Sequence, residues 1–566
     1  MKIVIIGGVA GGATAAARLR RLDERAEIVV LERSGYVSYA NCGLPYYIGG
    51  VIQDRKKLTL QTPESFLHRF NVDVRVHSEA VEILREQKKV RVRDLASGKE
   101  YLESYDKLIY SPGAQAMRPP FVQADERIFT LRTVEDTFRI DDFLHEHAVK
   151  NALVIGGGFI GLEAAENLVR RGVRVTVLQM EEQVMAPFDY DMACILHSCL
   201  RENGVDLRLK HAVSSLRGEE GGVVADAAGE TFRADCALVA IGVLPETYLA
   251  KAAGLDLGAG GAVVVDEHMR TSDPDIYAVG DAVQIFHSVT GKEARIPLAG
   301  PANKQGRIAA DNICGIGSVY CGAQGSSVFK CFNMTAAATG LNERAAAAAG
   351  ISCGSALLFS PNHATYYPGA RNMTLKVLYE EESGIIVGAQ AVGFEGVEKR
   401  IDVLATAIRA RMTAEDLTAL DLCYAPPFSS AKDPVNMAGY VIGNIRSGLV
   451  AQHTWKDVPA LAADPNAVFL DVQTKGEFEA AHLEGAVNIP VDELRGRIGE
   501  LDRNKTYYVN CYSGLRSYIA CRMLSAQGIR CSNLAGGIRF YQVVAKGGVY
   551  DGVPRYLCGM PNNGNF

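Results

Sequence analysis

Short runs of β-branched and other apolar residues alternate with helix-forming stretches in the first part of the chain. Residues 2–6 (KIVII) predict a buried strand, and a glycine-rich turn follows. Residues 14–23 favour a helix, and residues 27–32 (EIVVLE) predict the next strand. A strand, a glycine turn, a helix and a second strand are typical of the βαβ unit that binds a dinucleotide.

The same pattern returns over residues 151–178, where NALVIGG, LEAAENLVRRG and VRVTVL predict a strand, a helix and a strand around a second glycine turn. Further strands are predicted at 105–111, 235–241 and 274–283. Residues 326–446 mix strands and helices without a glycine fingerprint. A polar stretch at 447–466 predicts a linker, and a new α/β pattern starts at 467. The sequence therefore predicts an α/β protein with two Rossmann-like domains, an α+β domain and a C-terminal α/β domain.

Composition narrows the class of protein. The net charge is −6, with 48% hydrophobic and 22% charged residues, which excludes disorder and gives no basic excess for nucleic-acid binding. No apolar run approaches the roughly 18 residues of a membrane span, so we expect a cytoplasmic protein with no membrane partner. The 13 cysteines form no CxxC pair, so we expect neither a disulfide scaffold nor a metal site.

Both glycine turns suit the close approach of a pyrophosphate to backbone amides at a helix start. The second turn matches GxGxxG through Gly156, Gly158 and Gly161, whereas the first has Val9 at its middle position. The candidate glycines of the first turn are Gly7, Gly11 and Gly12. Glu32 ends the second strand, where a carboxylate would bind a ribose. The equivalent residue of the second repeat is Gln179, and no arginine follows it, so we expect NADH, with NADPH possible.

The two turns and the segment from Thr271 to Asp281 resemble the flavoprotein disulfide reductases that bind two dinucleotides. The resemblance covers residues 1–446 and implies FAD at the first turn and NAD(P)H at the second. In that family the last residue of the segment, here Asp281, contacts the flavin. The implied domains are an FAD-binding domain at 1–115 and 245–325, an NAD(P)H-binding domain at 116–244, and a dimerisation domain at 326–446.

A single cysteine stands where that family carries its redox pair. Residues 38–50 read SYANCGLPYYIGG, and Tyr47 occupies the position of the second family cysteine. Cys42 must therefore pair with a small thiol, become a sulfenic acid or carry a persulfide. We expect a helix start and the flavin to stabilise its thiolate.

This segment resembles coenzyme A–disulfide reductases and their persulfide-reducing relatives. The coenzyme A contacts that the resemblance implies are Thr14, Arg18, Arg21, Ser38, Asn41, Asn303 and Lys432. Some relatives have a lysine near position 71, where this chain has Asn71, so the resemblance does not carry that phosphate contact over to this chain. In the dimerisation domain, Tyr367 and Tyr424 match catalytic tyrosines that reach the other subunit. The implied working unit is a homodimer.

The C-terminal region resembles rhodanese domains, with a rhodanese-like domain over 467–566. Its decisive element is Val509–Ser517 (VNCYSGLRS), in which Cys511 enters a six-residue loop that ends at Arg516. Loop amides and a helix start can hold a thiolate or persulfide anion, and Arg516 adds positive charge. Gln473 replaces the usual arginine of the family's DVR motif.

These features predict an FAD-dependent, NADH-driven reductase that releases sulfide from a coenzyme A persulfide or polysulfide through Cys42. Cys511 would carry the sulfane sulfur, and the fusion would raise the local concentration of the shared intermediate. Three alternatives stay open. They are coenzyme A disulfide reduction for thiol balance, NADH oxidase or peroxidase chemistry through a Cys42 sulfenic acid, and non-reductive sulfur transfer by Cys511 alone.

Overall fold

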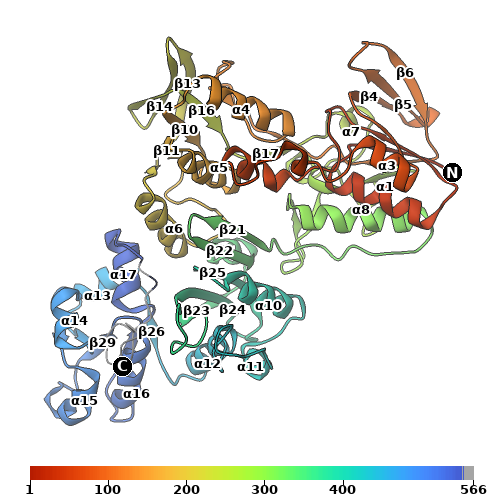
Figure 1. The fold of residues 1–566 in the computed structure, drawn as a ribbon. Coiled ribbons are helices and arrows are strands. Elements are labelled where there is room, and N and C mark those ends of the chain that lie inside the picture. The colour runs from red at the N-terminus through yellow and green to blue at the C-terminus, as the bar shows by residue number, and fades with distance from the viewer. Residues whose placement is uncertain (551, 553–566) are drawn as a thin grey trace. The chain divides into compact units, whose positions relative to one another are not determined.

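The computed structural model describes residues 1–550 and 552, and the chain folds into two compact units (Figure 1). One unit consists of residues 1–182 and 204–325. The other consists of residues 183–203 and the chain from 326 onward. Among the described residues, no helix is long and apolar enough to cross a membrane. Helices and parallel sheets alternate in the first unit, which confirms the predicted α/β class.

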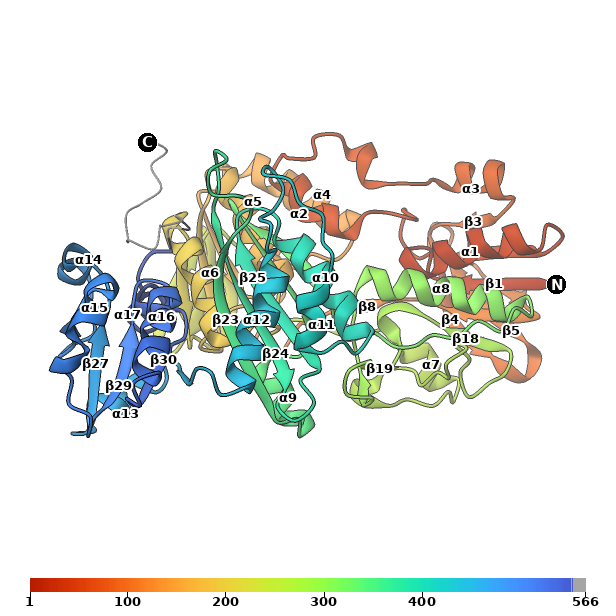
Figure 2. The ribbon, with the colours of Figure 1, turned by 90° about the horizontal axis from the view of Figure 1, so that it is seen from below.

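The first parallel sheet contains the first glycine turn and has the strand order β18-β7-β1-β2-β3. Its strands are β1 (Lys2–Ile6), β2 (Glu27–Leu31), β3 (Asp73–Arg75), β7 (Lys107–Tyr110) and β18 (Ile276–Ala278). Ile3 and Ile5 face helices α1 (Ala10–Leu22) and α8 (Ala299–Ile313), which lie side by side (Figures 1 and 2). Because side chains alternate along a strand, Val4 and Ile6 pack on the opposite face.

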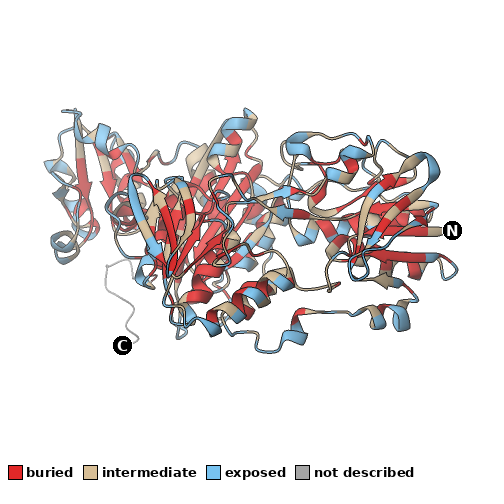
Figure 3. Cartoon of the chain, turned by 90° about the horizontal axis from the view of Figure 1, so that it is seen from above, coloured by how far each residue is buried: buried red, intermediate tan, exposed pale blue. Residues whose placement is uncertain are grey.

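That opposite face is covered by a small antiparallel sheet and a short helix. These elements are β4 (Ser78–Leu84), β5 (Lys89–Asp94), β6 (Glu100–Ser104) and α7 (Tyr248–Ala252). β18 and α8 follow the strands of the second sheet along the chain, so the first sheet is built from two separate stretches of sequence. Buried residues, red in Figure 3, follow the strands.

The second parallel sheet repeats this plan with the order β12-β11-β10-β16-β9. Its strands are β9 (Ile128–Phe129), β10 (Asn151–Ile155), β11 (Arg174–Gln179), β12 (Asp206–Leu209) and β16 (Cys236–Val239). Helices α4 (Val134–Glu146) and α5 (Phe159–Arg170) belong to it. An antiparallel sheet packs on its other face through Val223 and Ala225, and consists of β13 (Val213–Glu219), β14 (Gly222–Ala227) and β15 (Glu230–Ala234). The order β16-β10-β11-β12 reproduces β7-β1-β2-β3, so the repeat seen in the sequence is a structural repeat.

The second unit begins with an antiparallel sheet of order β21-β22-β25-β24-β23. Its strands are β21 (Ser327–Cys331), β22 (Met334–Gly340), β23 (Cys353–Pro361), β24 (Asn372–Glu380) and β25 (Ile386–Gly393). The accompanying helices are α9 (Glu343–Ala349), α10 (Val397–Arg409), α11 (Ala414–Ala419) and α12 (Pro434–Arg446).

Helix α6 (Tyr190–Glu202) differs from the expected domain boundaries, because it clusters with this sheet and not with the rest of 116–244. The buried Lys376 of β24 explains the attachment, since its ammonium lies 3.0 Å from both Asp189 and Asp191. Burial disfavours that charge, but the neighbouring carboxylates outweigh it and raise the pKa of Lys376.

The C-terminal sheet is parallel and has the order β26-β30-β29-β27-β28. Its strands are β26 (Gln452–His453), β27 (Ala467–Asp471), β28 (Val487–Asn488), β29 (Thr506–Asn510) and β30 (Cys531–Leu534). Its helices are α13 (Val458–Ala462), α14 (Lys475–Ala480), α15 (Val491–Arg497), α16 (Leu515–Ser525) and α17 (Gly537–Lys546). The expected linker at 447–466 therefore contains an edge strand and a helix of this domain.

Candidate functional site

The first glycine turn has a backbone that only glycine can adopt. Gly7 has a φ of +95°, and a Cβ there would lie 2.1 Å from the Ser111 carbonyl oxygen. A Cβ on Gly12 would lie 1.9 Å from the carbonyl oxygen of Gly7, so α1 starts directly against the turn. The N-terminus of α1 has no side-chain cap, which leaves its first amides for an anion.

Helix α1 also packs closely on α8 at Gly11, where a Cβ on Gly11 would lie 3.3 Å from the carbonyl oxygen of Ala302. A Cβ on Gly306 of α8 would lie 2.2 Å from the carbonyl oxygen of Gly11. The two helices therefore approach backbone to backbone. This approach brings α8 beside the helix that follows the glycine turn.

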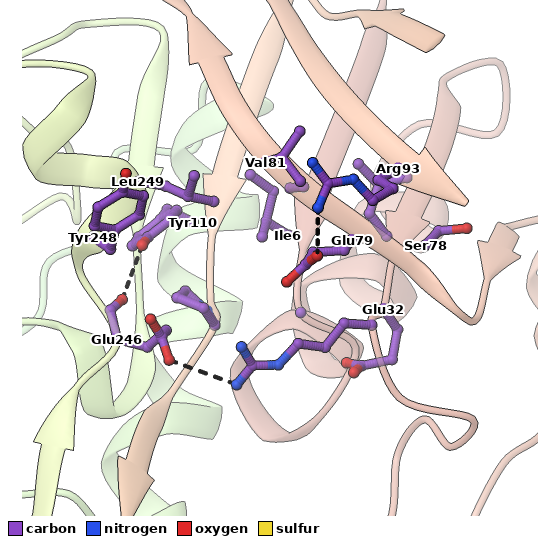
Figure 4. A pocket seen from close by; sticks show the side chains of 15 residues that line it. Ile6, Glu32, Ser78, Glu79, Val81, Arg93, Tyr110, Glu246, Tyr248 and Leu249 are labelled. Atoms are coloured by element: carbon purple, nitrogen blue, oxygen red, sulfur yellow. Dashed lines mark hydrogen bonds and ion pairs between the residues drawn. The ribbon is translucent and has the colours of Figure 1, made fainter. Parts of the chain in front are cut away.

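A cavity of about 320 Å³ opens beside the first turn and is lined by Gly7, Glu32 and Tyr110 (Figure 4). Glu32 is buried and accepts hydrogen bonds from the Gly8 amide at 2.9 Å and the Ser34 amide at 2.9 Å. Its carboxylate is thus fixed at the end of β2. A glycine cradle, an uncapped helix start and a fixed carboxylate fit the pyrophosphate and ribose of a dinucleotide.

The second glycine turn has the same geometry as the first, except that a glutamine, Gln179, replaces the carboxylate of Glu32. Gly156 has a φ of +106°, and a Cβ on Gly161 would lie 2.1 Å from the carbonyl oxygen of Gly156. A Cβ on Gly158 would meet nothing within 4 Å, so the space above the turn is open. The Gly157 amide donates to Gln179 Oε1 at 2.8 Å, so Gln179 takes the structural place of Glu32. These residues fit a second dinucleotide.

Asp281 lies in a tight turn after β18 and faces a residue that the sequence did not indicate. Its carboxylate is 2.7 Å from the Arg132 guanidinium, which also donates to the Ala114 carbonyl at 3.0 Å. Arg132 precedes α4 and belongs to no recognisable motif, so no sequence signal could have found it. The Asp281 carboxylate is therefore paired and oriented by the chain.

Cys42 lies in a 3-10 turn (Asn41–Gly43) directly before α2 (Leu44–Ile48), and it is exposed. Ser38, four residues earlier, adopts a φ of +46°, a strained conformation for a non-glycine residue. Desolvation and the nearby Glu163 raise the pKa of the Cys42 thiol, while Arg132 opposes them. Stabilisation of the thiolate by the start of α2 and by a bound flavin stays a prediction.

Glu163 of α5 is a second group that sequence reasoning missed. Burial raises its pKa to about 7, although Tyr46 Oη donates a hydrogen bond to it at 3.4 Å. Tyr46 belongs to α2, the helix that follows the turn containing Cys42. The helix of the second glycine turn thus places a titratable carboxyl next to the candidate nucleophile. Position 163 lies inside an ordinary helical pattern, which gave no signal.

The candidate coenzyme A contacts of the first unit are partly brought together. Thr14 Oγ1 donates to Asn303 Oδ1 at 2.5 Å, so α1 and α8 present both residues at one place. Arg18 is paired with the buried Asp311 at 2.7 Å, whereas Arg21 is exposed. We therefore expect Arg21 to be the more available cation for a phosphate.

Asn41 has a side-chain oxygen that is suited to accept a hydrogen bond from a bound molecule. Its Oδ1 atom is buried and has no hydrogen-bond partner among the residues that the structure describes. A buried polar atom without a partner is costly, so a bound donor would relieve it. Asn71 occupies the left-handed C-cap of α3 (Pro63–Phe70) at φ +46°, a position that suits asparagine better than lysine.

The remaining candidates belong to the second unit. Tyr367 packs edge-on against the buried His363, with 5.7 Å between ring centroids. Its neighbour Tyr366, which sequence reasoning missed, shares a 2.8 Å hydrogen bond with the Tyr424 hydroxyl. Lys432 is exposed in the same loop region as Tyr424.

Cys511 directly follows β29 and is buried, with 1% of its surface exposed. Its sulfur accepts hydrogen bonds from the Gly514 amide at 3.1 Å and from Ser517 Oγ at 3.3 Å. Helix α16 begins at Leu515, directly after the loop. The loop therefore forms the predicted cradle for a sulfur-centred anion.

Arg516 is close enough to Cys511 to interact with it electrostatically, and it is also held in an ion pair. Its guanidinium makes two hydrogen bonds to Glu477, at 2.7 and 2.8 Å. Burial disfavours its charge, but Glu477 outweighs this and raises the pKa of Arg516. Gln473, in place of the usual arginine, donates to the buried Asp471 at 3.0 Å. Arg516 thus braces the loop as one half of an ion pair.

Three family models match this chain in succession. Residues 1–306 match the pyridine nucleotide-disulphide oxidoreductase model, which covers more than half of the chain. The chain belongs to the pyridine nucleotide-disulphide oxidoreductase family. Residues 326–434 match the family's dimerisation domain, and residues 454–542 match the rhodanese-like domain. The family's cofactors are FAD and NAD(P)H, which agrees with the two dinucleotide sites.

Individual relatives of this oxidoreductase agree with the domain order. It is 35% identical to a coenzyme A disulfide reductase of Staphylococcus aureus over 440 residues, which are 78% of this chain and 99% of the relative. A reduced CoADR-RHD structure from Bacillus anthracis matches with 45% identity and a TM-score of 0.94, covering 96% of this chain and 98% of that chain. An NAD-dependent persulfide reductase from A. fulgidus matches with 39% identity and a TM-score of 0.90, covering 95% and 100%. The protein is an oxidoreductase that acts on sulfur.

Proposed function

We propose that this protein is an NADH-driven reductase that releases sulfide from coenzyme A persulfide, working in the cytoplasm as a homodimer. The observation that carries the proposal is the presence in one chain of an exposed cysteine at the redox position, Cys42, and a cradled sulfur site at Cys511. A simple disulfide reductase has no need for the second site. The similarity to coenzyme A disulfide and persulfide reductases supports the same substrate class.

The first step is a thiol–persulfide exchange at Cys42. The Cys42 thiolate attacks the coenzyme A sulfur, the sulfur–sulfur bond of the persulfide breaks, and hydrosulfide leaves. A mixed disulfide between Cys42 and coenzyme A remains. Two electrons from NADH then restore the Cys42 thiolate and the coenzyme A thiol, which takes up the proton that NADH releases.

The chain's residues bind the cofactors and the substrate. FAD, when bound, supplies the two-electron path between nicotinamide and thiol. Its pyrophosphate and ribose would be held at Gly7, Gly11, Gly12 and Glu32, with Asp281 at the ribityl part. Coenzyme A would be held by the following side chains: Thr14, Arg18, Arg21, Ser38, Asn41, Asn303 and Lys432.

Two tyrosines of the dimerisation domain would act on the leaving sulfur. Tyr367 and Tyr424 are both partly exposed, at 43% and 47%. A phenol hydroxyl can donate a hydrogen bond or a proton to a sulfur anion as it leaves. In a homodimer we expect these hydroxyls to serve the Cys42 of the other subunit.

The second nucleotide site favours NADH over NADPH. Gln179 accepts a hydrogen bond from the Gly157 amide. Glu181 and Glu182 follow it along the chain. An arginine, the usual partner of a 2′-phosphate, is absent from the residues directly after Gln179. Two nearby carboxylates would repel the phosphate.

Anaerobic NADH oxidation with sulfide detection tests the proposal. Coenzyme A persulfide is compared with coenzyme A disulfide for the wild type and for Cys42→Ser, Cys511→Ser and Cys321→Ser. Cys321 is an exposed cysteine outside both sites and serves as the matched control. Rapid sulfide release that needs Cys42 but not Cys321 is the expected result.

The same experiment separates the alternatives. Turnover of the disulfide without any sulfide from the persulfide would favour a thiol-balance reductase. NADH consumption that requires oxygen would favour an oxidase working through a Cys42 sulfenic acid. Sulfur transfer that needs Cys511 and no NADH would favour a sulfurtransferase.

A further inference from the structure

Two cysteines of the rhodanese-like domain lie against each other, outside the loop that holds Cys511. Cys521 lies in the middle of α16, and Cys531 is the first residue of β30, the strand on which that helix packs. The Cys531 thiol donates a hydrogen bond to the Cys521 carbonyl oxygen at 3.4 Å, and the two thiols are hydrogen-bonded to each other. Both cysteines are reduced. Since a disulfide forms without large backbone movement only between residues already in contact, this pair meets the condition.

The two thiols differ in their access to solvent. Cys521 is 1% exposed and belongs to an apolar cluster together with Val509 and Leu524. Cys531 is half-buried and packs at the edge of the same cluster. A reagent from solution therefore reaches Cys531 first, and Cys521 is a shielded partner behind it.

Polar contacts favour the thiolate at Cys531. The hydroxyl of Ser525, one turn after Cys521 on α16, lies 3.4 Å from the Cys531 sulfur. The hydrogen bond with Cys521 lowers the pKa of Cys531 to about 7, with further help from Ser525 and Arg522, although burial opposes it. Because Cys521 keeps the shared proton, its own pKa is raised. The thiolate, which is the nucleophilic form of a cysteine, therefore forms at Cys531.

This pair is separate from the Cys511 loop. The Cys511 sulfur accepts its hydrogen bonds from Gly514 and Ser517. Among the described residues, no hydrogen bond joins Cys511 Sγ to Cys521 or Cys531. The domain thus combines one enclosed single thiol with a distinct dithiol.

We propose that Cys531 and Cys521 form a redox dithiol that sulfane sulfur oxidises to a disulfide, with release of sulfide and without NADH. The chemical class that the site takes is a persulfide, such as coenzyme A persulfide. The site goes beyond the proposed function, because its reaction needs neither Cys42 nor a flavin.

The reaction has two steps. The Cys531 thiolate attacks the outer sulfur of the persulfide, the sulfur–sulfur bond breaks, and the coenzyme A thiolate leaves, so that Cys531 carries a persulfide. Cys521 then attacks Cys531 Sγ, gives its proton to the departing hydrosulfide and closes the disulfide. In total the two cysteine thiols lose two electrons and the sulfane sulfur gains them. The products are the disulfide, the coenzyme A thiol and sulfide.

Anaerobic treatment of the reduced, full-length holoenzyme with coenzyme A persulfide, without NADH, tests the proposal. The parent protein for this test carries Cys42→Ser and Cys511→Ser, so that those two sites contribute no sulfide. Free thiols are then alkylated, and peptide mass spectrometry locates the disulfides. The expected result is a disulfide between Cys521 and Cys531, with about one more sulfide per chain than when Cys531→Ser is added.

Two further substitutions in the same parent protein separate the roles of the thiols. Cys521→Ala should leave a persulfide on Cys531, because no thiol then displaces the hydrosulfide, and sulfide release should fall to the level of Cys531→Ser. Cys353→Ser removes another half-buried cysteine and should match the parent. Far-ultraviolet circular dichroism and bound-flavin absorbance check that each variant is folded. The disulfide itself is detected in the parent, where the pair is unchanged.

The outcomes separate this inference from the proposed function. If Cys521 and Cys531 are both alkylated after treatment, and the parent releases no more sulfide than Cys531→Ser, the dithiol is refuted. A disulfide that forms with hydrogen peroxide but not with the persulfide would refute sulfane sulfur as its oxidant. Neither result depends on Cys42 or NADH, so the reductase and the dithiol stand or fall separately. The pair takes no part in turnover at Cys42 or in transfer from Cys511, so Cys531→Ser alone should keep both basal rates.

Discussion

The two sulfur sites of this protein, Cys42 and Cys511, have opposite surroundings. Cys42 is exposed, and its environment raises the pKa of the thiol through desolvation and the charge of Glu163. Cys511 is 1% exposed, and its sulfur accepts two hydrogen bonds from Gly514 and Ser517. The Cys42 thiol is exposed, and no described residue donates a hydrogen bond to it, whereas the Cys511 thiol is enclosed and accepts two.

This difference matches two different tasks. A thiol that attacks a substrate must be reachable and retains more nucleophilicity when its anion is not strongly stabilised. A thiol that carries a sulfane sulfur must keep a persulfide anion intact, which favours enclosure and hydrogen-bond donors. We therefore propose that Cys42 attacks the substrate and that Cys511 stores the sulfur, so a change at one site should affect mainly the step that belongs to it.

The largest expected effect is that of Cys42→Ser. Because a hydroxyl at this position cannot attack the sulfur–sulfur bond at neutral pH, NADH-dependent sulfide release should fall at least about a thousandfold. Steady-state NADH oxidation under argon measures it. Cys321→Ser should match the wild type. Substantial residual reduction in Cys42→Ser would mean that another thiol is the nucleophile.

Cys511→Ser should lower the rate of sulfur transfer from thiosulfate to cyanide by roughly a hundredfold or more. Reduction of free coenzyme A persulfide should persist in this variant, since Cys42 is intact. Cys531→Ser, a half-buried cysteine of the same domain, is the matched control. Loss of persulfide reduction in Cys511→Ser would show that the two sites cannot work separately.

The repeated glycine turns were predictable because each is encoded within a short segment. Gly7 and Gly156 require positive φ angles, and the apolar strands before them are recognisable by composition alone. The Cys511 loop is local in the same way, since its sulfur contacts come from residues 514 and 517. At both turns and at the Cys511 loop, the residues that determine the local backbone geometry lie close together in the sequence.

The missed features depend on contacts between distant segments. Glu163 lies near Cys42 only because α5 packs beside α2. Helix α6 joins the dimerisation sheet through Lys376, 185 residues beyond Asp191. No local pattern of apolar and polar residues encodes such pairings, so they became visible only in three dimensions.

Ser517→Ala tests how much one hydrogen bond to the enclosed Cys511 sulfur contributes to sulfur transfer. The serine hydroxyl is fully buried and donates to Cys511 Sγ, so its loss should weaken the hold on the sulfur anion by about 1 kcal/mol, or about fivefold in sulfur transfer. Cyanide-dependent thiocyanate formation measures this. Ser525→Ala, on the far turn of α16, is the matched control. Equal rates for both variants would argue that the Gly514 amide alone holds the sulfur.

Glu163→Gln tests how the neighbouring carboxyl affects the reactivity of the exposed Cys42 thiol, and this effect should depend on pH. Burial raises the pKa of Glu163 to about 7, so the carboxyl is neutral well below pH 7 and becomes negative as the pH rises through this value. Only the charged form opposes ionisation of Cys42, and it therefore contributes to the raised pKa of that thiol mainly above neutrality.

We therefore compare the rate of Cys42 alkylation in Glu163→Gln with that in the wild type. The variant should react about as fast as the wild type in weak acid and about three times faster at neutral pH. This ratio of the variant rate to the wild-type rate should rise further in weak base, because charge repulsion then acts on the wild type alone. Iodoacetamide labelling followed by peptide mass spectrometry measures Cys42 specifically. Glu146→Gln, an exposed change on α4, should give a ratio of one throughout. A pH-independent ratio for Glu163→Gln would mean that this carboxyl affects Cys42 through packing and not through its charge, and the open site would then owe its weakly acidic thiol to desolvation alone.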